Sequence, residues 1–328
     1  MLLLTHEDVA GLLSPKDAIE AVRAGLKEQA AGQVQIPPRT TTDYTSGKGW
    51  LRLMPVIMNG AGYMGFKAMH STAGVGVRYR ISLYEMDSGE LLSEMDADWI
   101  TSHRTSAMVA VATDELARKE ATELGVLGSS EQAKAMVQAV AAVRSFRRVR
   151  VFSPNPEHRR AFVESIRSQL EIDAVAVDSA EEAAAAEVVC VAIRAGEEPA
   201  FRAGWLRSGA HFSGISSVRP EAREIEDAVW SRADVVVVDD LGHVLESGDG
   251  RSGLASGELR EERMAELWQI VSGEKPGRTT PDQITLFKSV GTALQDLSLA
   301  IAVYQRARER GIGRDAGEFP HIRPFGRQ

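Results

Sequence analysis

A turn made of small residues at positions 128–133 has the spacing that phosphate binding requires. It follows the apolar run Leu124–Leu127 and leads into a helical pattern. The geometry needs a small residue for the turn, a second where the backbone approaches a pyrophosphate, and a third where helix meets strand. Because N–H groups at a helix start attract anions, we predict a dinucleotide site here. Its expected residues are Gly128, Ser129, Ser130, Gln132 and Ala133.

Ser130 departs from the usual pattern, which has glycine at the second position. Serine fits there only if its backbone avoids positive φ, and its hydroxyl then becomes a further donor to phosphate. The alternative interpretation of these residues is an ordinary turn between a strand and a helix.

The end of the next expected strand, 149–152, bears on the choice of cofactor. A carboxylate there would hold the ribose hydroxyls of NAD, but the chain has none before Glu157. The polar and basic residues that follow the strand suit a 2′-phosphate, so the sequence favours NADP(H), with NAD(H) as the alternative. These residues are Ser153, Asn155, Arg159 and Arg160. Alternatively, both arginines lie on the solvated face of the next helix.

Strands and helices alternate from residue 124 onward, which is typical of a parallel sheet covered on both faces. The expected strands are 124–127, 149–152, 174–177, 188–193, 211–213, 235–238 and 284–287. The expected helices are 132–143, 157–170, 181–185 and 260–271. With the phosphate-binding turn, this α/β pattern predicts a Rossmann-type, doubly wound parallel sheet over residues 118–292.

The residues before this sheet predict an α+β domain, on which the last helix of the chain can pack. Ser14, Pro15 and Asp17 have the pattern of a capped helix start. Short runs at 50–54, 63–69 and 77–84, separated by turn residues, indicate antiparallel strands. Helices are expected at 96–119 and 292–310.

Composition excludes several classes of function. The formal net charge of -8 argues against nucleic acid or an anionic membrane as the main partner. The single cysteine, Cys190, excludes an intrachain disulfide and a cysteine-based zinc site, and we predict no metal. The N-terminal residues lack a secretion signal, and no run approaches the roughly 18 apolar residues of a membrane span. We therefore expect a cytoplasmic protein.

Five stretches, in this order and on this length of chain, resemble the ornithine cyclodeaminase/mu-crystallin family. They are Ile36–Arg39, Gly65–Lys67, Thr101–Ala107, the turn Gly128–Ala133, and Thr285–Gly291 continuing to Leu297. The resemblance implies a domain for substrate binding and dimerisation, made of 1–117 and 293–328, and a homodimer formed through its strands.

The resemblance also assigns roles to individual residues. Arg39, Lys67 and Arg104 would grip the α-carboxylate of a substrate, and such cations suit a carboxylate. Lys67 is the expected proton donor, with His70 as the second candidate. Thr105 would contact the phosphate on the nicotinamide side, and Ser289 and Gly291 would lie near the nicotinamide. Asp296 is a polar partner there, or alternatively a helix cap or salt bridge.

One departure from the family pattern decides the expected chemistry. Cyclodeaminases carry a catalytic aspartate at the position that Val218 occupies here, and valine cannot act as a base or hold an ammonium group. The segments Arg219–Glu224 and Phe287–Gly291 resemble the mu-crystallin branch instead. That resemblance implies an NAD(P)H-dependent reductase of an imino acid or ketimine, or in reverse an amino acid dehydrogenase. The alternatives are an ornithine or lysine cyclodeaminase, which Val218 disfavours, and a non-enzymatic protein that binds NADP(H).

Overall fold

The computed structural model describes residues 1–215 and 219–320 of the chain. Contacts divide it into two compact units, one of Met1–Arg104 with Thr292–Gln328 and one of Thr105–Gly291. Helix α3 (Asp98–Leu116) belongs to both, because the division falls within it. Within the described residues, no helix combines the length and apolar character that crossing a membrane requires.

The first unit is built on a sheet in the order β16-β1-β7-β6-β5-β4-β2, with β3 paired to β4. Its centre is an antiparallel meander of β4 (Gly49–Met58), β5 (Tyr63–Thr72), β6 (Gly76–Glu85) and β7 (Leu91–Asp96). The meander confirms the expected antiparallel strands, and the observed strands are longer than the predicted ones. The outer strands are β1 (Leu2–Leu4), β2 (Val34–Gln35), β3 (Thr40–Asp43) and β16 (Arg314–Asp315).

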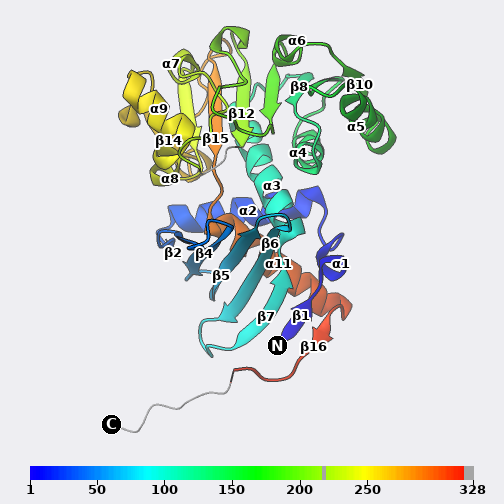
Figure 1. The fold of residues 1–328 in the computed structure, drawn as a ribbon, viewed down its shortest axis with the longest axis vertical. Helices are drawn as coiled ribbons and strands as arrows, with labels where there is room; N and C mark the ends of the chain where they lie inside the picture. The colour runs from blue at the N-terminus through cyan, green and yellow to red at the C-terminus, as the bar shows by residue number, and fades with distance from the viewer. Residues whose placement is uncertain (216–218, 321–328) are drawn as a thin grey trace. The chain divides into compact units, whose positions relative to one another are not determined.

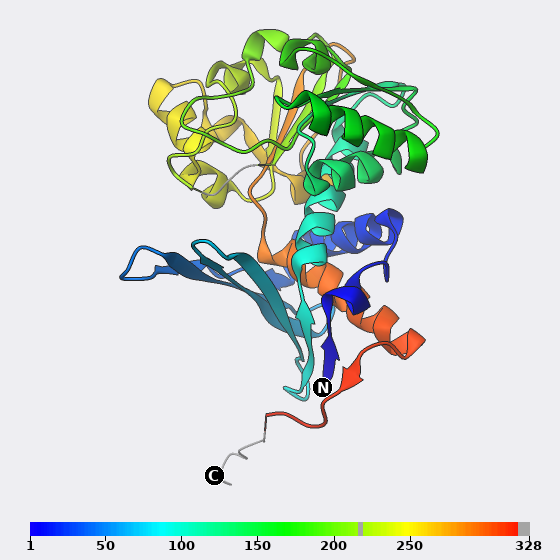
Figure 2. The ribbon, with the colours of Figure 1, turned by 45° about the vertical axis from the view of Figure 1, so that its right-hand side comes forward.

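Helices cover one face of this sheet. Helix α11 (Ala293–Arg310) lies against β4, β5 and β6, and α2 (Pro15–Ala30) packs on α11 (Figure 2). Ser14 caps α2 in a capping box with Asp17, as the sequence predicts. Gly25 lets the two helices approach closely, since a Cβ there would meet the Ser298 hydroxyl. The short helix α1 (His6–Val9) follows β1.

The second unit is a parallel sheet in the order β10-β9-β8-β11-β12-β15-β13-β14 (Figure 1). The chain reverses its direction of progress between β8 and β11, the switch point at which such sheets bind ligands. The strand from the end of the unit, β15, is inserted between β12 and β13. The strands are β8 (Glu123–Leu127), β9 (Arg148–Phe152), β10 (Asp173–Ala176), β11 (Val188–Val191), β12 (His211–Ile215), β13 (Val235–Val238), β14 (Met264–Glu266) and β15 (Thr285–Ser289).

The helices of this unit follow the expected alternation with one exception. The predicted helix 260–271 is wrong, because Met264–Glu266 adds to the sheet edge as β14 and pairs with β13. Only Leu267–Val271 remains helical there, as α10. The other helices are α4 (Glu131–Ala141), α5 (Pro156–Gln169), α6 (Ala180–Ala184), α7 (Ala228–Arg232), α8 (Leu241–Glu246) and α9 (Gly248–Ser256), with 3₁₀ turns at Ala203–Trp205 and Glu261–Arg263.

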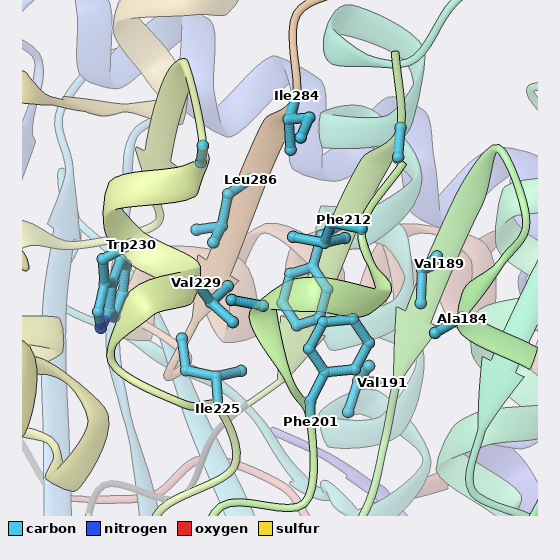
Figure 3. Packing of buried hydrophobic residues seen from close by; sticks show 14 of the residues in the cluster. Ala184, Val189, Val191, Phe201, Phe212, Ile225, Val229, Trp230, Ile284 and Leu286 are labelled. Atoms are coloured by element: carbon cyan, nitrogen blue, oxygen red, sulfur yellow. The ribbon is translucent and has the colours of Figure 1, made fainter. Parts of the chain in front are cut away.

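A large apolar cluster holds this sheet to the segments that cover it. Phe201 and Phe212 pack with ring centroids 4.7 Å apart, and Trp230 and Leu286 are buried in the same cluster (Figure 3). Burial of side chains of this size contributes roughly 1.5–3 kcal/mol each. The cluster therefore fixes the strands whose carboxyl ends carry the candidate cofactor residues.

Candidate functional site

A buried cluster of charges in the first unit joins two of the predicted substrate cations. Lys67 on β5 donates to Asp296 Oδ1 at 2.8 Å and lies 2.7 Å from Oδ2. Arg104 Nε lies 2.9 Å from Asp296 Oδ1, and its Nη1 donates to Gln295 at 2.6 Å. The salt bridge, which was one of the interpretations given for Asp296, is present. One carboxylate thus holds two cations side by side.

Burial controls the protonation of Lys67. Desolvation lowers the pKa of its ammonium group to about 8, although Asp296 acts to raise the pKa. The positive charges of Arg104 and Arg39 add to the lowering. Lys67 can therefore gain or lose a proton near neutral pH, as a general acid or base must. Arg39, in the loop between β2 and β3, lies within electrostatic range of the cluster but is less buried.

The strand register explains how Lys67 comes to face this cluster. Side chains alternate across a strand, and Lys67 lies between Met54 and Ile81, all three on the buried face under α11. Asp296 is in the first turn of α11, where the helix dipole favours a negative charge. Tyr79 on β6 also faces the cluster, with the Lys67 ammonium 5.9 Å from its ring centroid.

His70 is not close enough to share the proton-donor role. It is three residues beyond Lys67 on the same strand, so its side chain lies on the opposite face of the sheet. There it is exposed and pairs in register with Leu51 and Arg78.

In the second unit, the predicted phosphate-binding turn has the geometry that it needs. Gly128 has φ +123°, and a Cβ there would meet the backbone of Ala192, so no other residue fits. Ser130 has φ −82°, which satisfies the condition set for a serine at this place. Its hydroxyl caps α4 by accepting from Ala133 N at 3.2 Å. The N–H groups at the start of α4 are thus presented next to a glycine turn.

A cavity of about 450 Å³ lies beside this turn. Gly128, Ser129 and Ser130 line one side and Ser153 lines another, with Ser129 donating to the Ser153 hydroxyl at 2.9 Å. His158 and Arg194 are further lining residues. These residues suit a dinucleotide, because the backbone can approach phosphates closely and the side chains are neutral or cationic.

The other predicted cofactor residues mostly have protein partners. Asn155 caps α5 through Glu157 N and His158 N. Arg159 stacks on Phe152, donates to Ser153 O and pairs with the exposed Asp178 at 2.7 Å. Gln132 donates to Ser106 on α3 at 3.0 Å, and Thr105 is a buried residue of the same helix.

Asp239 organises the turn that contains Ser289 and Gly291. Its carboxylate accepts from the Ser289 hydroxyl at 2.6 Å and from Val290 N and Gly291 N at 3.1 and 2.7 Å. Gly291 has φ +81°, so glycine is needed here. Asp239 was not among the predicted site residues, although its place just after β13, at the carboxyl end of a parallel strand, was a usable signal.

A fully buried ion cluster, which the sequence did not predict, surrounds Lys288. Lys288 on β15 lies 2.6 Å from Glu224 Oε2 and 2.8 Å from Asp249 Oδ2. Asp249 Oδ1 accepts from Glu224 N and Ile225 N. The acids raise the pKa of Lys288 against the effect of its burial. The cluster anchors the segment 224–225 to the centre of the sheet.

Val218, on which the sequence argument against cyclodeamination rests, lies outside the described residues.

Both units fall within the match to a single known protein family. The model of the ornithine cyclodeaminase/mu-crystallin family matches residues 1–311. Delta(1)-pyrroline-2-carboxylate reductase of Bacillus cereus is 30% identical over 321 residues, covering 95% of this chain and 98% of the relative. Ketimine reductase mu-crystallin of Rattus norvegicus is 30% identical, covering 91% and 93%. The structure of Thermococcus litoralis Delta(1)-pyrroline-2-carboxylate reductase with NADH and L-proline superposes with a TM-score of 0.91, 34% identity, and coverage of 96% and 100%.

Proposed function

Because this chain belongs to the ornithine cyclodeaminase/mu-crystallin family, we propose that it reduces the carbon–nitrogen double bond of an imino acid or ketimine. The chain is an NAD(P)-dependent oxidoreductase, as its reductase relatives and the NADH-bound neighbour indicate. The observation that carries the proposal is the buried Lys67–Asp296–Arg104 cluster, since it combines a carboxylate-binding cation with a proton source. In reverse, the same reaction is the dehydrogenation of an amino acid.

Each member of the cluster has a separate role in this proposal. Arg104 binds the substrate carboxylate, because a guanidinium can donate to both of its oxygens, and Arg39 adds positive charge. Lys67 delivers a proton to the imine nitrogen, which the low pKa of its ammonium group favours. Asp296 holds Lys67 and Arg104 in fixed orientation. An iminium needs no further base, so the valine at position 218 is compatible with reduction.

The cofactor residues proposed are those around the turn at Gly128. When bound, NAD(P)H supplies the hydride that the imine carbon accepts. Gly128, Ser129 and Ser130 would hold its phosphates, and Ser153 would lie beside the ribose of the adenosine half. Thr105, Gln132, Ala133, Ser289 and Gly291 remain proposed cofactor residues; of these, Ala133 and Gln132 would act by shaping the start of α4.

We propose NADP(H) as the preferred cofactor. Ser153, Asn155 and Arg159 follow β9 where a carboxylate would favour NAD, and the cavity residues His158 and Arg194 bear no negative charge. Asp178 is 97% exposed, so a 2′-phosphate can compete with it for Arg159 at small cost.

The test is NAD(P)H oxidation, followed by absorbance, with 1-pyrroline-2-carboxylate and 1-piperideine-2-carboxylate. We expect turnover with the wild type and a loss of at least about 100-fold in kcat/KM for Lys67→Met. Oxidation of neither cofactor with either imine would overturn the proposal. Ammonia release from ornithine without net oxidation of cofactor would indicate a cyclodeaminase. Tight cofactor binding without turnover would indicate a non-enzymatic role.

We also propose a homodimer formed through the first unit. Leu51 and Leu53 lie on the face of the sheet opposite to Lys67 and are 43% and 39% exposed. Leu51 also lines a cavity of about 990 Å³. Apolar strand faces of this kind are covered in stable assemblies. Light scattering after gel filtration should give twice the chain mass, and Leu51→Glu with Leu53→Glu should give monomers. A wild-type monomer would contradict the proposal.

A further inference from the structure

Arg52 is a basic residue on the same sheet face as Lys67. On β4, Arg52 is two residues before Met54, and Met54 is paired with Lys67. Residues two apart on a strand share a face, so Arg52 and Lys67 are diagonal neighbours on adjacent strands. Such neighbours lie about 7–8 Å apart at their backbones. Across the sheet, Arg52 pairs with Met69 on β5, and Met69 pairs with Tyr79 on β6.

The contacts of the Arg52 guanidinium orient it without neutralising it. Its Nε donates to the Thr41 hydroxyl on β3 at 2.8 Å, and the group stacks over the Trp50 ring at 5.2 Å from the centroid. Asp43 attracts it from a longer range and is exposed, so water screens this attraction. Within 1–215 and 219–320, neither of its terminal amino groups has a hydrogen bond and it forms no ion pair.

Partial burial of the Arg52 guanidinium costs free energy, because the charge is partly removed from water. Arg52 is only partly exposed, and this burial lowers the pKa of its guanidinium. A desolvated charge without an ionic partner costs free energy that an anionic ligand can recover. The terminal amino groups of an arginine match a carboxylate in a planar, bidentate geometry. Arg52 is therefore suited to bind a second carboxylate of a ligand. That carboxylate would lie about the length of an arginine side chain from the Lys67 cluster.

We propose that Arg52 determines substrate specificity by binding a carboxylate on the substrate side chain, so that the preferred substrates are 2-imino dicarboxylic acids. This rests on the proposed function, in which Arg104 and Lys67 engage the α-carboxyl end. Thr41 and Trp50 then hold the guanidinium so that its terminal amino groups can donate hydrogen bonds to the ligand carboxylate. The reaction adds a hydride to the imine carbon and a proton to its nitrogen, and oxidises NAD(P)H to NAD(P)⁺, giving an amino dicarboxylate.

The experiment compares two kinds of imine in the full-length protein. Imines formed from oxaloacetate or 2-oxoglutarate with ammonia have two carboxylates, and 1-pyrroline-2-carboxylate has one. We expect Arg52→Met to lower kcat/KM for the dicarboxylic imines about 10- to 100-fold, as for loss of a charged hydrogen bond, and to leave that for 1-pyrroline-2-carboxylate nearly unchanged. Arg52→Lys should give an intermediate loss, because a lysine keeps the charge but not the bidentate geometry.

Arg306→Met is the matched control, since Arg306 is a half-exposed arginine on α11 of the same unit; it should change neither activity. If Arg52→Met does not fold, as judged by its thermal transition, Arg52→Gln must show the same split. A wild type that reduces 1-pyrroline-2-carboxylate but no dicarboxylic imine overturns this inference and leaves the proposed function intact. An equal loss on both substrates in the Arg52 variants also overturns it, because Arg52 would then serve only the β3–β4 pairing. A wild type that reduces no imine overturns the proposed function itself.

Discussion

Lys67 and Asp296 are 229 positions apart in the chain, yet they share a 2.8 Å hydrogen bond with side chains only 1% and 2% exposed. The bond links β5, an inner strand of the first unit, to the helix that follows the second unit in sequence. Neither charge is stable in such surroundings alone. The pair therefore requires both parts of the discontinuous unit to be folded together.

The pH dependence of imine reduction should follow the ammonium group of Lys67. Its pKa is lowered to about 8 by burial, so the acid form is present below pH 8 and is lost as the pH rises through this value. We expect kcat/KM for reduction to fall above about pH 8. A variant Lys67→Arg, which keeps its proton throughout this range, should lack the fall. The same fall in both proteins would assign it to another group.

Asp296→Asn should shift that fall to lower pH. The carboxylate raises the pKa of Lys67, so its removal leaves burial and Arg104 to lower the pKa further. The pH profile of kcat/KM measures the shift. Gln295→Met is the control, because Gln295 contacts Arg104 rather than Lys67, and the position of its fall should match that of the wild type.

Arg104→Ala should raise KM and lower kcat together. The guanidinium both binds and orients the carboxylate in our proposal, and the loss of a charged hydrogen bond corresponds to about 10- to 100-fold in kcat/KM. Steady-state kinetics with 1-pyrroline-2-carboxylate check this. Arg104→Lys should recover part of the loss, and kinetics unchanged from the wild type in Arg104→Ala would remove this residue from the site.

Ser153→Asp should shift preference from NADPH toward NADH. Ser153 lines the cavity beside the turn at Gly128, where a carboxylate would repel a 2′-phosphate and accept from ribose hydroxyls. The ratio of kcat/KM for the two cofactors should fall by roughly tenfold or more, the effect of about 1.4 kcal/mol. Ser153→Thr, which adds no charge, should leave the ratio close to that of the wild type. An unchanged ratio in Ser153→Asp would refute our account of β9.

Lys288→Met should destabilise the protein strongly. The substitution leaves Glu224 and Asp249 buried without their cation, and breaking a buried ion pair in this way costs about 3–5 kcal/mol. Denaturant unfolding measures the change in the free energy of unfolding. Lys119→Met removes a lysine whose side chain is 75% exposed, so its effect should stay below about 1 kcal/mol.

The sequence predicted those features that are encoded locally. The cap at Ser14, the glycine turn at Gly128 and the alternation of strands and helices depend on residues close together in the chain, and all three are present in the structure. The helix expected at 260–271 failed because Met264–Glu266 has a partner in β13 that no local pattern reveals. An edge pairing overrode helical propensity there.

Contacts between distant segments were harder to predict. Nothing near Lys288 in the sequence indicates that Glu224 and Asp249 will surround it, and nothing near Arg52 places it beside Lys67 until the register of β4 and β5 is known. Asn155 was predicted for the cofactor, and Arg159 for the cofactor or for the solvated face of the next helix, yet in the structure Asn155 caps α5 and Arg159 pairs with Asp178. Asn side chains favour such N-cap positions because they bond to nearby backbone N–H groups.

The place of β15 between β12 and β13 sets the order in which the chain can mature. A growing polypeptide lacks this inner strand until residue 289 has left the ribosome. Until then, β13, with β14 at its other edge, has no strand to pair with on the β15 side. Helix α11 follows at once and supplies Asp296 to a lysine synthesised long before. Both units are therefore completed by the same stretch, residues 285–310, and a nascent chain that stops before it exposes apolar surface in each of them.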